Sequence, residues 1–553
     1  MSERRGEPHR RALLVAPALL AIAALLPALA AGFVHDDGPQ IVHNPLLHDL
    51  GRLPELWGTS VWAGAGSGSS WYRPVMMTAF ALERALFGLD PRAMHAVSLL
   101  LYAGVVALGV ILAPVRPERR DCAALAVALF AVHPLNAEAA VWLSARNELL
   151  AAGFGLLALG AHRRARDGGG RPALLRGASG AALALALLSK ESAVVFPLVM
   201  LADDWNARAG FSPRSLARRY AAPLLAAVGY LAARTAALGD PAGGVFAPFA
   251  PGDALGALGE AARRLLWPVG LTISPAPPAP VWAGLGAVLL GAFAGALAWA
   301  ARRRSPGLVP LTLGLAQLLV AALAATRVGE LADRYLLLFV LAAAWGLALA
   351  LQELGAAGLR RAGVGIAGLV LVLGAGAWTQ AGVFRSDATL WEHAVERNPA
   401  SARAVLNLAS ARLGGGRPHE ALALLERAEA LSPGDPQVAL NRAAAAWALG
   451  DAAAARAILE ALRERRPADP TVLTNLGHLA LEEDAFAEAA DHYRGAVRLN
   501  PLSAEAWAGL GVAHQRLGRR EEARTALEQA LRLDPAVQNA ALLRRLLESE
   551  GRP

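Results

Sequence analysis

The sequence predicts an all-α protein in two parts, a multi-pass membrane domain over residues 1–384 and a helical solenoid over residues 385–553. Apolar runs long enough to cross a bilayer as helices all lie before residue 384. After it, prolines recur at residues 399, 433, 467, 501 and 535, a constant step of 34 residues. Hydrophobic residues make up 55% of the chain, which fits a protein largely inside a membrane.

We expect about eleven membrane spans from the lengths of the apolar runs. A basic segment with Arg4, Arg5, Arg10 and Arg11 precedes the first run. That run is too long for a signal-peptide core, so it is expected to stay as an anchor. Residues 73–89 are expected to form a surface helix, and residues 239–280 a loop with one helix. The expected spans are 12–33, 93–114, 121–135, 138–161, 175–189, 192–205, 220–238, 281–300, 307–326, 335–352 and 362–383.

The positions of the basic residues predict how the chain is oriented in the membrane. With the N-terminus in the cytoplasm and the spans alternating, the arginine clusters around Arg116, Arg163, Arg214, Arg302 and Arg360 all fall inside, as the positive-inside rule expects. Arg263 and Arg264 fall outside and are the exception. The rule also accounts for the net charge of +8 without a nucleic-acid partner. The expected location is the inner membrane, with residues 385–553 on the periplasmic or extracytoplasmic side.

The 34-residue step is the period of the tetratricopeptide repeat. The last unit carries the pattern Trp507, Leu510, Gly511, Ala523 and Pro535. We expect a partial leading unit, four repeats and a polar capping helix over residues 536–553. Such arrays present a concave groove to peptides or proteins, so the repeats are expected to engage a protein; a rigid stalk or a dimer surface is the alternative.

Polar motifs far apart in the sequence converge on the outer face in this topology. Asp36 and Asp37 follow the first span, where two adjacent carboxylates are costly unless water or a cation meets them. They are the predicted catalytic residues, and the same pair is the candidate ligand for a divalent cation. The predicted substrate-binding residues are Arg73, His133, Glu138, Arg146, Lys190, Glu191, Arg327, Asp333, Arg334 and Tyr335.

Lys190 is the only lysine among 53 basic side chains of lysine or arginine. Its compact ammonium can contact a phosphate as a point charge where a guanidinium would not fit. There are two alternative explanations for the single lysine. It is present by chance, or its long side chain extends to the membrane–water interface to place its charge there. Each of these charged residues, taken singly, is more often an ion-pair partner than a catalyst. Together, cations and carboxylates at one lipid-adjacent face suit a lipid-phosphate substrate.

These residues suggest glycosyl transfer from a polyprenyl-phosphate sugar. A carboxylate would take the proton of an acceptor hydroxyl as it attacks the anomeric carbon, and fixed cations would stabilise the departing phosphate. One carboxylate base without a glycosyl-enzyme intermediate implies inversion. The second aspartate can orient the acceptor or hold a cation, and the sequence does not decide between these roles.

The order of the motifs resembles the transmembrane-and-tetratricopeptide-repeat O-mannosyltransferases, within the GT-C membrane glycosyltransferases. The resemblance implies that Asp36 and Asp37 form the acidic pair of the first outer loop. It also implies a polyprenyl-phosphate-linked sugar, and repeats that engage an exported protein. The departures are Asp333, where relatives often carry Glu, and Leu337-Leu338 in place of a Tyr/Pro tail. The motifs are His35-Asp36-Asp37 with Ile41 and Asn44, Tyr72-Arg73-Pro74, His133-Pro134 with Glu138, Arg146 with Glu148 and Leu149, Lys190-Glu191, and Asp333-Arg334-Tyr335-Leu336.

Two other functions fit parts of the sequence. A non-catalytic membrane scaffold would use only the repeats, and it predicts that Asp36 and Asp37 can be neutralised without loss. A lipid-linked glycan polymerase or ligase would keep its chemistry without residues 385–553. A transporter fits less well, because the ionisable residues gather at one face rather than near the middle of the membrane. The sequence leaves open the sugar, the acceptor, the metal requirement and the oligomeric state.

Overall fold

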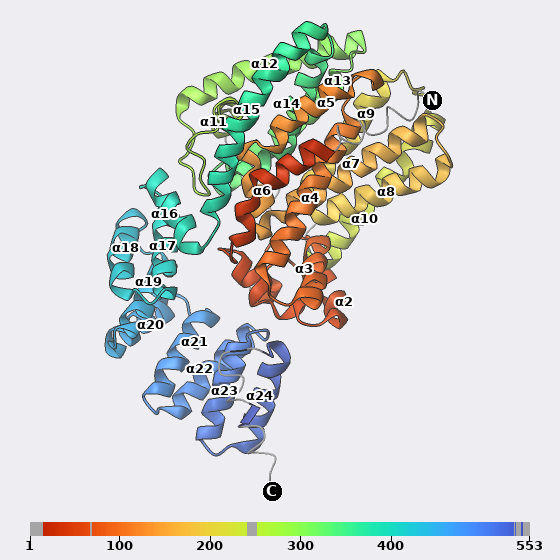
Figure 1. The fold of residues 1–553 in the computed structure, drawn as a ribbon. Coiled ribbons are helices and arrows are strands. Elements are labelled where there is room, and N and C mark those ends of the chain that lie inside the picture. Colours follow the sequence, from red (N-terminus) through yellow and green to blue (C-terminus); the bar gives the residue numbers. More distant parts are fainter. Residues whose placement is uncertain (1–14, 67–68, 240–250, 536, 538–543, 546–553) are drawn as a thin grey trace. The chain divides into compact units, whose positions relative to one another are not determined.

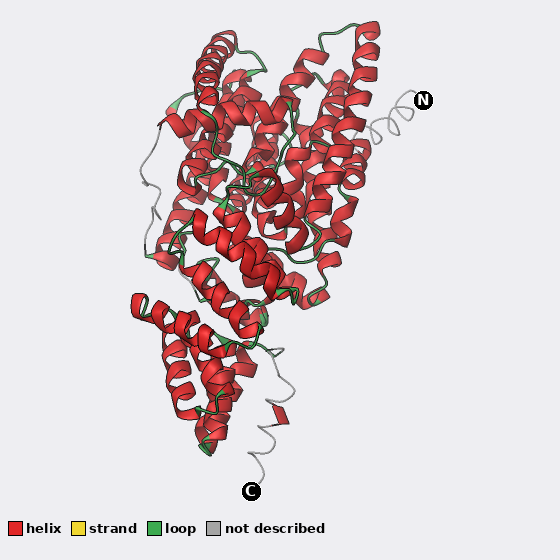
Figure 2. Cartoon of the chain, turned by 90° about the vertical axis from the view of Figure 1, so that its left-hand side faces the viewer, coloured by secondary structure: helices red, strands yellow, loops and turns green. Residues whose placement is uncertain are grey.

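The computed structural model describes residues 15–66, 69–239, 251–535, 537 and 544–545. Within these residues the chain consists of helices and loops and contains no strand (Figure 2). It divides into two compact units. The membrane unit comprises Met1–Val34, Tyr72–Ala79 and Leu89–Leu390, and the repeat unit comprises His35–Trp71, Phe80–Gly88 and Trp391–Pro553. Residues 35–71, which the sequence analysis placed with the spans, thus belong to the same unit as the repeats.

Long helices dominate the membrane unit (Figure 1). Neighbours in sequence often pack together: α7 lies against α8, α8 against α10, and α13 against α14. Helix α3 Pro74–Phe87 is divided between the units, because Phe80–Gly88 belongs to the repeat unit. The other helices of the membrane unit are α4 Pro91–Leu112, α5 Arg120–Ala131, α6 Ala137–Val141, α7 Arg146–Arg166, α8 Pro172–Ser189, α9 Phe196–Asn206, α10 Pro213–Leu238, α11 Pro251–Leu266, α12 Pro280–Arg303, α13 Leu308–Val328, α14 Leu337–Leu351 and α15 Ala356–Val383.

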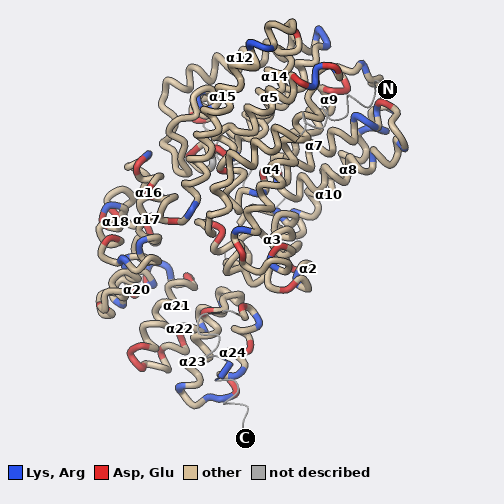
Figure 3. The backbone as a smooth tube through the Cα atoms, in the orientation of Figure 1, with Lys and Arg blue, Asp and Glu red and all other residues tan. Residues whose placement is uncertain are grey.

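Seven described helices are long and apolar enough to cross a membrane, so the chain is a multi-pass membrane protein. The count rises to eight if the bent pair Pro117–Ala131 and Pro134–Val141 forms one span. In Figure 3, α12 and α15 are uncharged over most of their length, with basic residues near their ends. The count is below the expected eleven or so because several expected spans are short here. Examples are α5, with 12 residues, and α9, with 11 residues.

A helix break lies just before Pro134, near the boundary between the expected spans 121–135 and 138–161. The pair of helices around it is bent by 62°. His133 caps the short helix Pro134–Asn136, because its Nδ1 accepts a hydrogen bond from the Leu135 backbone N–H at 3.3 Å. Its Nε2 therefore donates to the Leu265 carbonyl at 3.0 Å, which joins the break to α11.

The tetratricopeptide-repeat array is confirmed. The first helix of each repeat begins after a Ser or Asp cap, which satisfies a free backbone N–H at the helix start. These caps are Ser401, Asp435, Asp469 and Ser503, at the same 34-residue step as the prolines. The expected capping helix over residues 536–553 falls almost wholly outside the described residues. The helices are α16 Asp387–Arg397, α17 Ala402–Gly414, α18 Pro418–Leu431, α19 Pro436–Ala448, α20 Ala452–Arg465, α21 Pro470–Glu482, α22 Phe486–Leu499, α23 Ala504–Arg516 and α24 Arg520–Leu533.

Candidate active site

The residues predicted to form the site are divided between the two units. Asp36 and Asp37 belong to the repeat unit. Arg327 lies in α13, and its side chain is outside the described set. The membrane unit holds Arg73, His133, Glu138, Arg146, Lys190, Glu191, Asp333, Arg334 and Tyr335.

Arg334 joins two motifs that are 196 residues apart in the sequence. Its guanidinium forms an ion pair with Glu138 in α6, and its backbone N–H donates to the other oxygen of that carboxylate at 3.2 Å. The guanidinium also lies 5.0 Å from the ring centre of Trp142 and 4.7 Å from that of Tyr335. Aromatic faces attract cations, so these contacts hold the guanidinium in one place.

The single lysine lies in the same cluster. The Lys190 ammonium is buried, forms an ion pair with Glu148 at the start of α7, and lies 4.5 Å from the ring centre of Tyr335. The Tyr335 ring therefore has two cations near it, Lys190 and Arg334. An ammonium has three N–H donors, so one carboxylate does not use all of them. Contact of Lys190 with a phosphate stays a prediction.

Arg73 and Glu191 form the next pair of the cluster, with 3.2 Å between Arg73 Nη2 and Glu191 Oε1. Burial by itself raises the pKa of the Glu191 carboxyl, but the nearby positive charges of Arg73 and Lys190 outweigh it and lower that pKa below its ordinary value. Glu191 is therefore ionised at neutral pH. The Tyr72-Arg73-Pro74 and Lys190-Glu191 motifs, far apart in sequence, thus meet in one ionic network.

Arg264 is a functional candidate that the sequence analysis did not select. It is 4% exposed and lies 2.5 Å from Asp333, and it also donates to the Leu331 carbonyl at 2.9 Å and to Glu260 at 2.9 Å. Arg264 therefore fixes the start of the Asp333-Arg334-Tyr335 motif. The signal was present in the sequence, because Arg263 and Arg264 were the exception to the positive-inside rule.

Arg146 is a different case from the other predicted cations. It is fully buried, and it donates to the Ser98 hydroxyl at 3.0 Å and to the Met94 carbonyl at 2.7 Å. Both partners lie in α4, so Arg146 ties the start of α7 to that helix. This position gives Arg146 a structural role, and its predicted contact with substrate stays a prediction.

The acidic pair lies at an irregular point of the backbone in the repeat unit. His35 has a φ of 49°, which is uncommon for a residue other than glycine, and a π-helical turn, Gly38–Val42, follows Asp37 directly. Asp36 lies 3.2 Å from His35 Nε2 and is one-quarter exposed, whereas Asp37 is fully buried. The two neighbouring carboxylates thus have different surroundings, which suits two different roles.

The segment that follows the acidic pair carries a pH-sensitive contact with the repeats. Burial lowers the pKa of His48 to about 4, and the positive charges of Arg84, Arg52 and His43 add to this more than Asp534 opposes it. The folded pKa lies below the ordinary value of 6.5. The unfolded segment therefore binds more protons between these values, and stability falls as the pH drops from about 6.5 toward 4.

We expect the backbone amides of residues 44–48 to lose protection against hydrogen exchange on going from pH 7 to pH 5, by up to about 2 kcal/mol after correction for intrinsic rates. Exchange mass spectrometry measures this. His48→Leu should remove the pH dependence, and the exposed His43→Leu should retain it. Equal pH dependence in both variants would rule out His48 as the cause.

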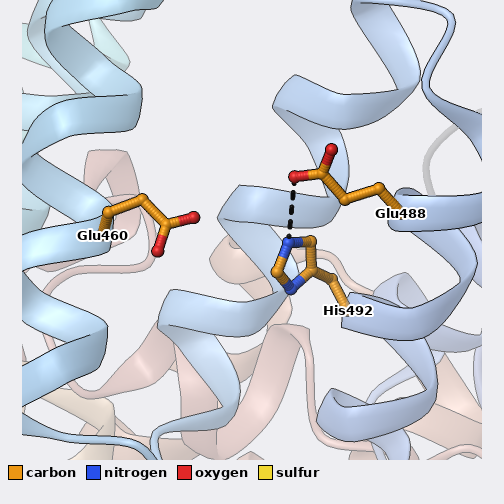
Figure 4. A group of neighbouring side chains, drawn as sticks. All are labelled: Glu460, Glu488 and His492. Atoms are coloured by element: carbon orange, nitrogen blue, oxygen red, sulfur yellow. Dashed lines mark hydrogen bonds and ion pairs between the residues drawn. The ribbon is translucent and has the colours of Figure 1, made fainter.

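The described residues contain one group of three side chains with ligand atoms within 4.8 Å of one another, namely Glu460, Glu488 and His492 (Figure 4). It does not include Asp36 or Asp37. Arg463 lies 2.6 Å from Glu460, and Arg456 lies 2.7 Å from Glu488, so cations already neutralise both carboxylates. The group is a helix-surface ion network rather than a metal centre.

The fold and the ionic cluster define a multi-pass membrane protein with a C-terminal tetratricopeptide-repeat array. Models of the tetratricopeptide repeat match residues 384–436, 412–476 and 504–537. Among solved structures, a crystal structure of MamA protein matches with 18% identity and a TM-score of 0.23, covering 27% of this chain and 81% of that one.

The chain is similar to protein O-mannosyl-transferases of animals. It is 34% identical to Tmtc1 of Drosophila melanogaster over 152 residues, which are 26% of this chain and 17% of that protein. It is 33% identical to TMTC1 of Homo sapiens over 179 residues, 30% of this chain and 20% of that protein. It is 34% identical to Tmtc2 of Drosophila melanogaster over 197 residues, 34% of this chain and 21% of that protein. The chain thus spans about a fifth of the length of these relatives.

Proposed function

We propose that the chain is a membrane glycosyltransferase that moves mannose or another hexose from a polyprenyl-phosphate donor to Ser or Thr hydroxyls of exported proteins. The observation that carries this proposal is the buried ionic cluster of the membrane unit. It brings together cations from four distant parts of the sequence, namely Arg73, Lys190, Arg264 and Arg334. The names of the similar proteins support a sugar donor and a protein acceptor.

The reaction proceeds in one displacement with inversion. The acceptor hydroxyl oxygen attacks the anomeric carbon, the bond from that carbon to the phosphate oxygen breaks, and the lipid phosphate leaves with the electron pair. A carboxylate of the acidic pair takes the hydroxyl proton. Asp36, the more exposed of the two, is assigned as this base, and Asp37 holds its position or orients the acceptor.

Lys190 and Arg334 are assigned to the leaving phosphate. Fixed cations in a water-poor site stabilise negative charge that develops during the reaction. Both cations keep N–H donors beyond those that their carboxylate partners accept. The carboxylates of Glu138 and Glu148 balance the charge of the two cations and orient them, so no unpaired charge is buried before the donor binds.

The orientation follows the arginine clusters. The N-terminus lies in the cytoplasm, and the repeats lie outside the cytoplasmic membrane, where they meet exported acceptors. Asp36 and Asp37 are also the candidate ligands of a divalent cation, and transfer assays with and without a chelator test this role.

The function is tested by comparative glycoproteomics on a strain that lacks the gene and on the same strain complemented with it. We expect hexose-modified Ser and Thr peptides of exported proteins to disappear in the deletion strain and return on complementation. Unchanged glycopeptides in both strains would contradict the proposal. A membrane scaffold, or an enzyme with a glycan acceptor, would then be the better assignment.

A further inference from the structure

The loop over residues 35–71 is held against the repeats at several points of the repeat unit. The ring of His35 lies 4.9 Å from that of Trp391, edge to face, at the start of the array. His48 lies 3.8 Å from Asp534 at its end. Between these points, Gly66 lies directly on Asn500, the residue before Pro501. The acidic pair therefore belongs to a loop that contacts the beginning of the array, the turn between its third and fourth repeats, and its end.

A polar cavity of about 700 Å³ lies between this loop and the turns that join consecutive repeats. Gly66 is on the loop side, and Asp469, Asn475, Asn500 and Glu505 are on the repeat side. Asn475 forms no side-chain hydrogen bond with another described residue, so its amide can pair with a bound molecule. Asn441, one repeat earlier at the same position of the unit, instead donates to the Ser410 hydroxyl at 2.6 Å.

We propose that this cavity binds an extended polypeptide segment of the acceptor protein. The inference rests on the proposed function, and it assigns the binding of the two substrates to different units. The repeat unit, which contains the loop with Asp36 and Asp37, binds the acceptor. The membrane unit, which contains Lys190 and Arg334, binds the lipid-linked donor.

The chemistry of the lining favours a polypeptide over other ligands. Carboxamide side chains such as Asn475 offer both a donor and an acceptor, which match the N–H and C=O groups of an extended backbone. Arg465 and Arg466 are balanced by Asp469 and Glu505, so the cavity lacks the excess positive charge that a nucleic acid needs. Its polar lining does not suit a lipid chain.

At Gly66 the loop approaches the repeats very closely. Gly66 has a φ of 72°, and a Cβ atom there would lie 1.9 Å from Asn500 Nδ2. The chain can approach the repeats this closely only because it has no side chain at that point. The wall of the cavity formed by the loop therefore depends on glycine at this position.

The test uses the full chain in detergent and a fluorescent peptide made of glycine, alanine, serine and threonine. Asn475→Ala should weaken peptide binding about threefold to tenfold, the effect of one or two lost hydrogen bonds. Asn441→Ala is the matched control, and it should bind as the wild type does. Equal affinity in the two variants, or absence of peptide binding by the wild type, would overturn the inference.

A second measurement reports where the peptide binds rather than how tightly it binds. Cysteines introduced as Asn475→Cys and Asn441→Cys are labelled with a maleimide, while the natural Cys122 is buried. The peptide should slow labelling in the first variant only. Equal protection of both, or of neither, would also overturn the inference.

The role of the loop is tested by a pair of glycine variants. Gly66→Ala and Gly88→Ala both place a side chain at a left-handed backbone, with φ values of 72° and 65°, but only Gly66 meets a neighbour within 4 Å. Gly66→Ala should lower peptide affinity by at least about threefold relative to Gly88→Ala. Equal affinities would show that the loop is not part of the site. Peptide binding without any mannose transfer by the wild type would instead contradict the proposed function and leave the docking site intact.

Discussion

Replacing Asp36 and Asp37 together by asparagine is expected to lower mannose transfer by about 10²-fold to 10⁴-fold. This is the usual loss when a general base is removed, because an amide cannot take the hydroxyl proton. Asparagine has the same shape as aspartate, so the segment from His35 to the π-helical turn at Gly38–Val42 should keep its backbone. The measurement is transfer from a synthetic polyprenyl-phosphate mannose to a Ser/Thr peptide, followed by mass spectrometry.

The single variants separate the two roles. Asp36→Asn should carry most of the loss in turnover if Asp36 is the base. Asp37→Asn should act more on acceptor affinity, since Asp37 is buried and orients the site. Asp49→Asn is the matched control, because Asp49 is exposed in the same loop and caps Gly51, a task that asparagine performs equally well. A double variant that transfers mannose at the rate of the control would favour the scaffold function.

Arg264→Leu is expected to destabilise the membrane unit by about 3–5 kcal/mol, since it leaves the buried carboxylate of Asp333 without its cation. The effect should also reach activity, because Asp333 is adjacent to Arg334 in the motif that faces Glu138. Thermal unfolding of the purified chain in detergent measures the first effect, and transfer to the peptide measures the second.

Arg263→Leu is the control for this prediction. Arg263 is adjacent in sequence and pairs with Glu260, but its side chain is 25% exposed, so the loss should be at most about 1 kcal/mol. Combining Arg264→Leu with Asp333→Leu should restore part of the stability, because no unpaired carboxylate remains buried. Equal unfolding temperatures for Arg263→Leu and Arg264→Leu would contradict the importance of the buried pair.

Much of the fold could be predicted because its signals are local. The array follows from Pro399, Pro433 and their successors, since each repeat is one helical hairpin stacked on the next. The bend at Pro134 follows from the missing N–H and the fixed φ of proline. The number of spans was harder to predict, because the length of a helix in the membrane unit depends on neighbouring helices as well as on apolar runs.

The sequence predicted many of the residues that form the site, but not which residues form ion pairs with one another. The sequence selected Lys190, Arg334 and Asp333 as unusual polar residues near span ends. It offered no means of knowing that Glu148 pairs with Lys190, or that Arg264 pairs with Asp333. In the sequence, Arg264 was notable only as an exception to the positive-inside rule.

The sequence by itself determined the helical class, the apolar spans and the repeat period, because each depends on residues within one or two turns of a helix. Only the tertiary structure decided which charges face each other and that residues 35–71 belong with the repeats. Those outcomes depend on contacts between segments hundreds of residues apart. No local spacing encodes such contacts, since the packing of whole helices and loops fixes them.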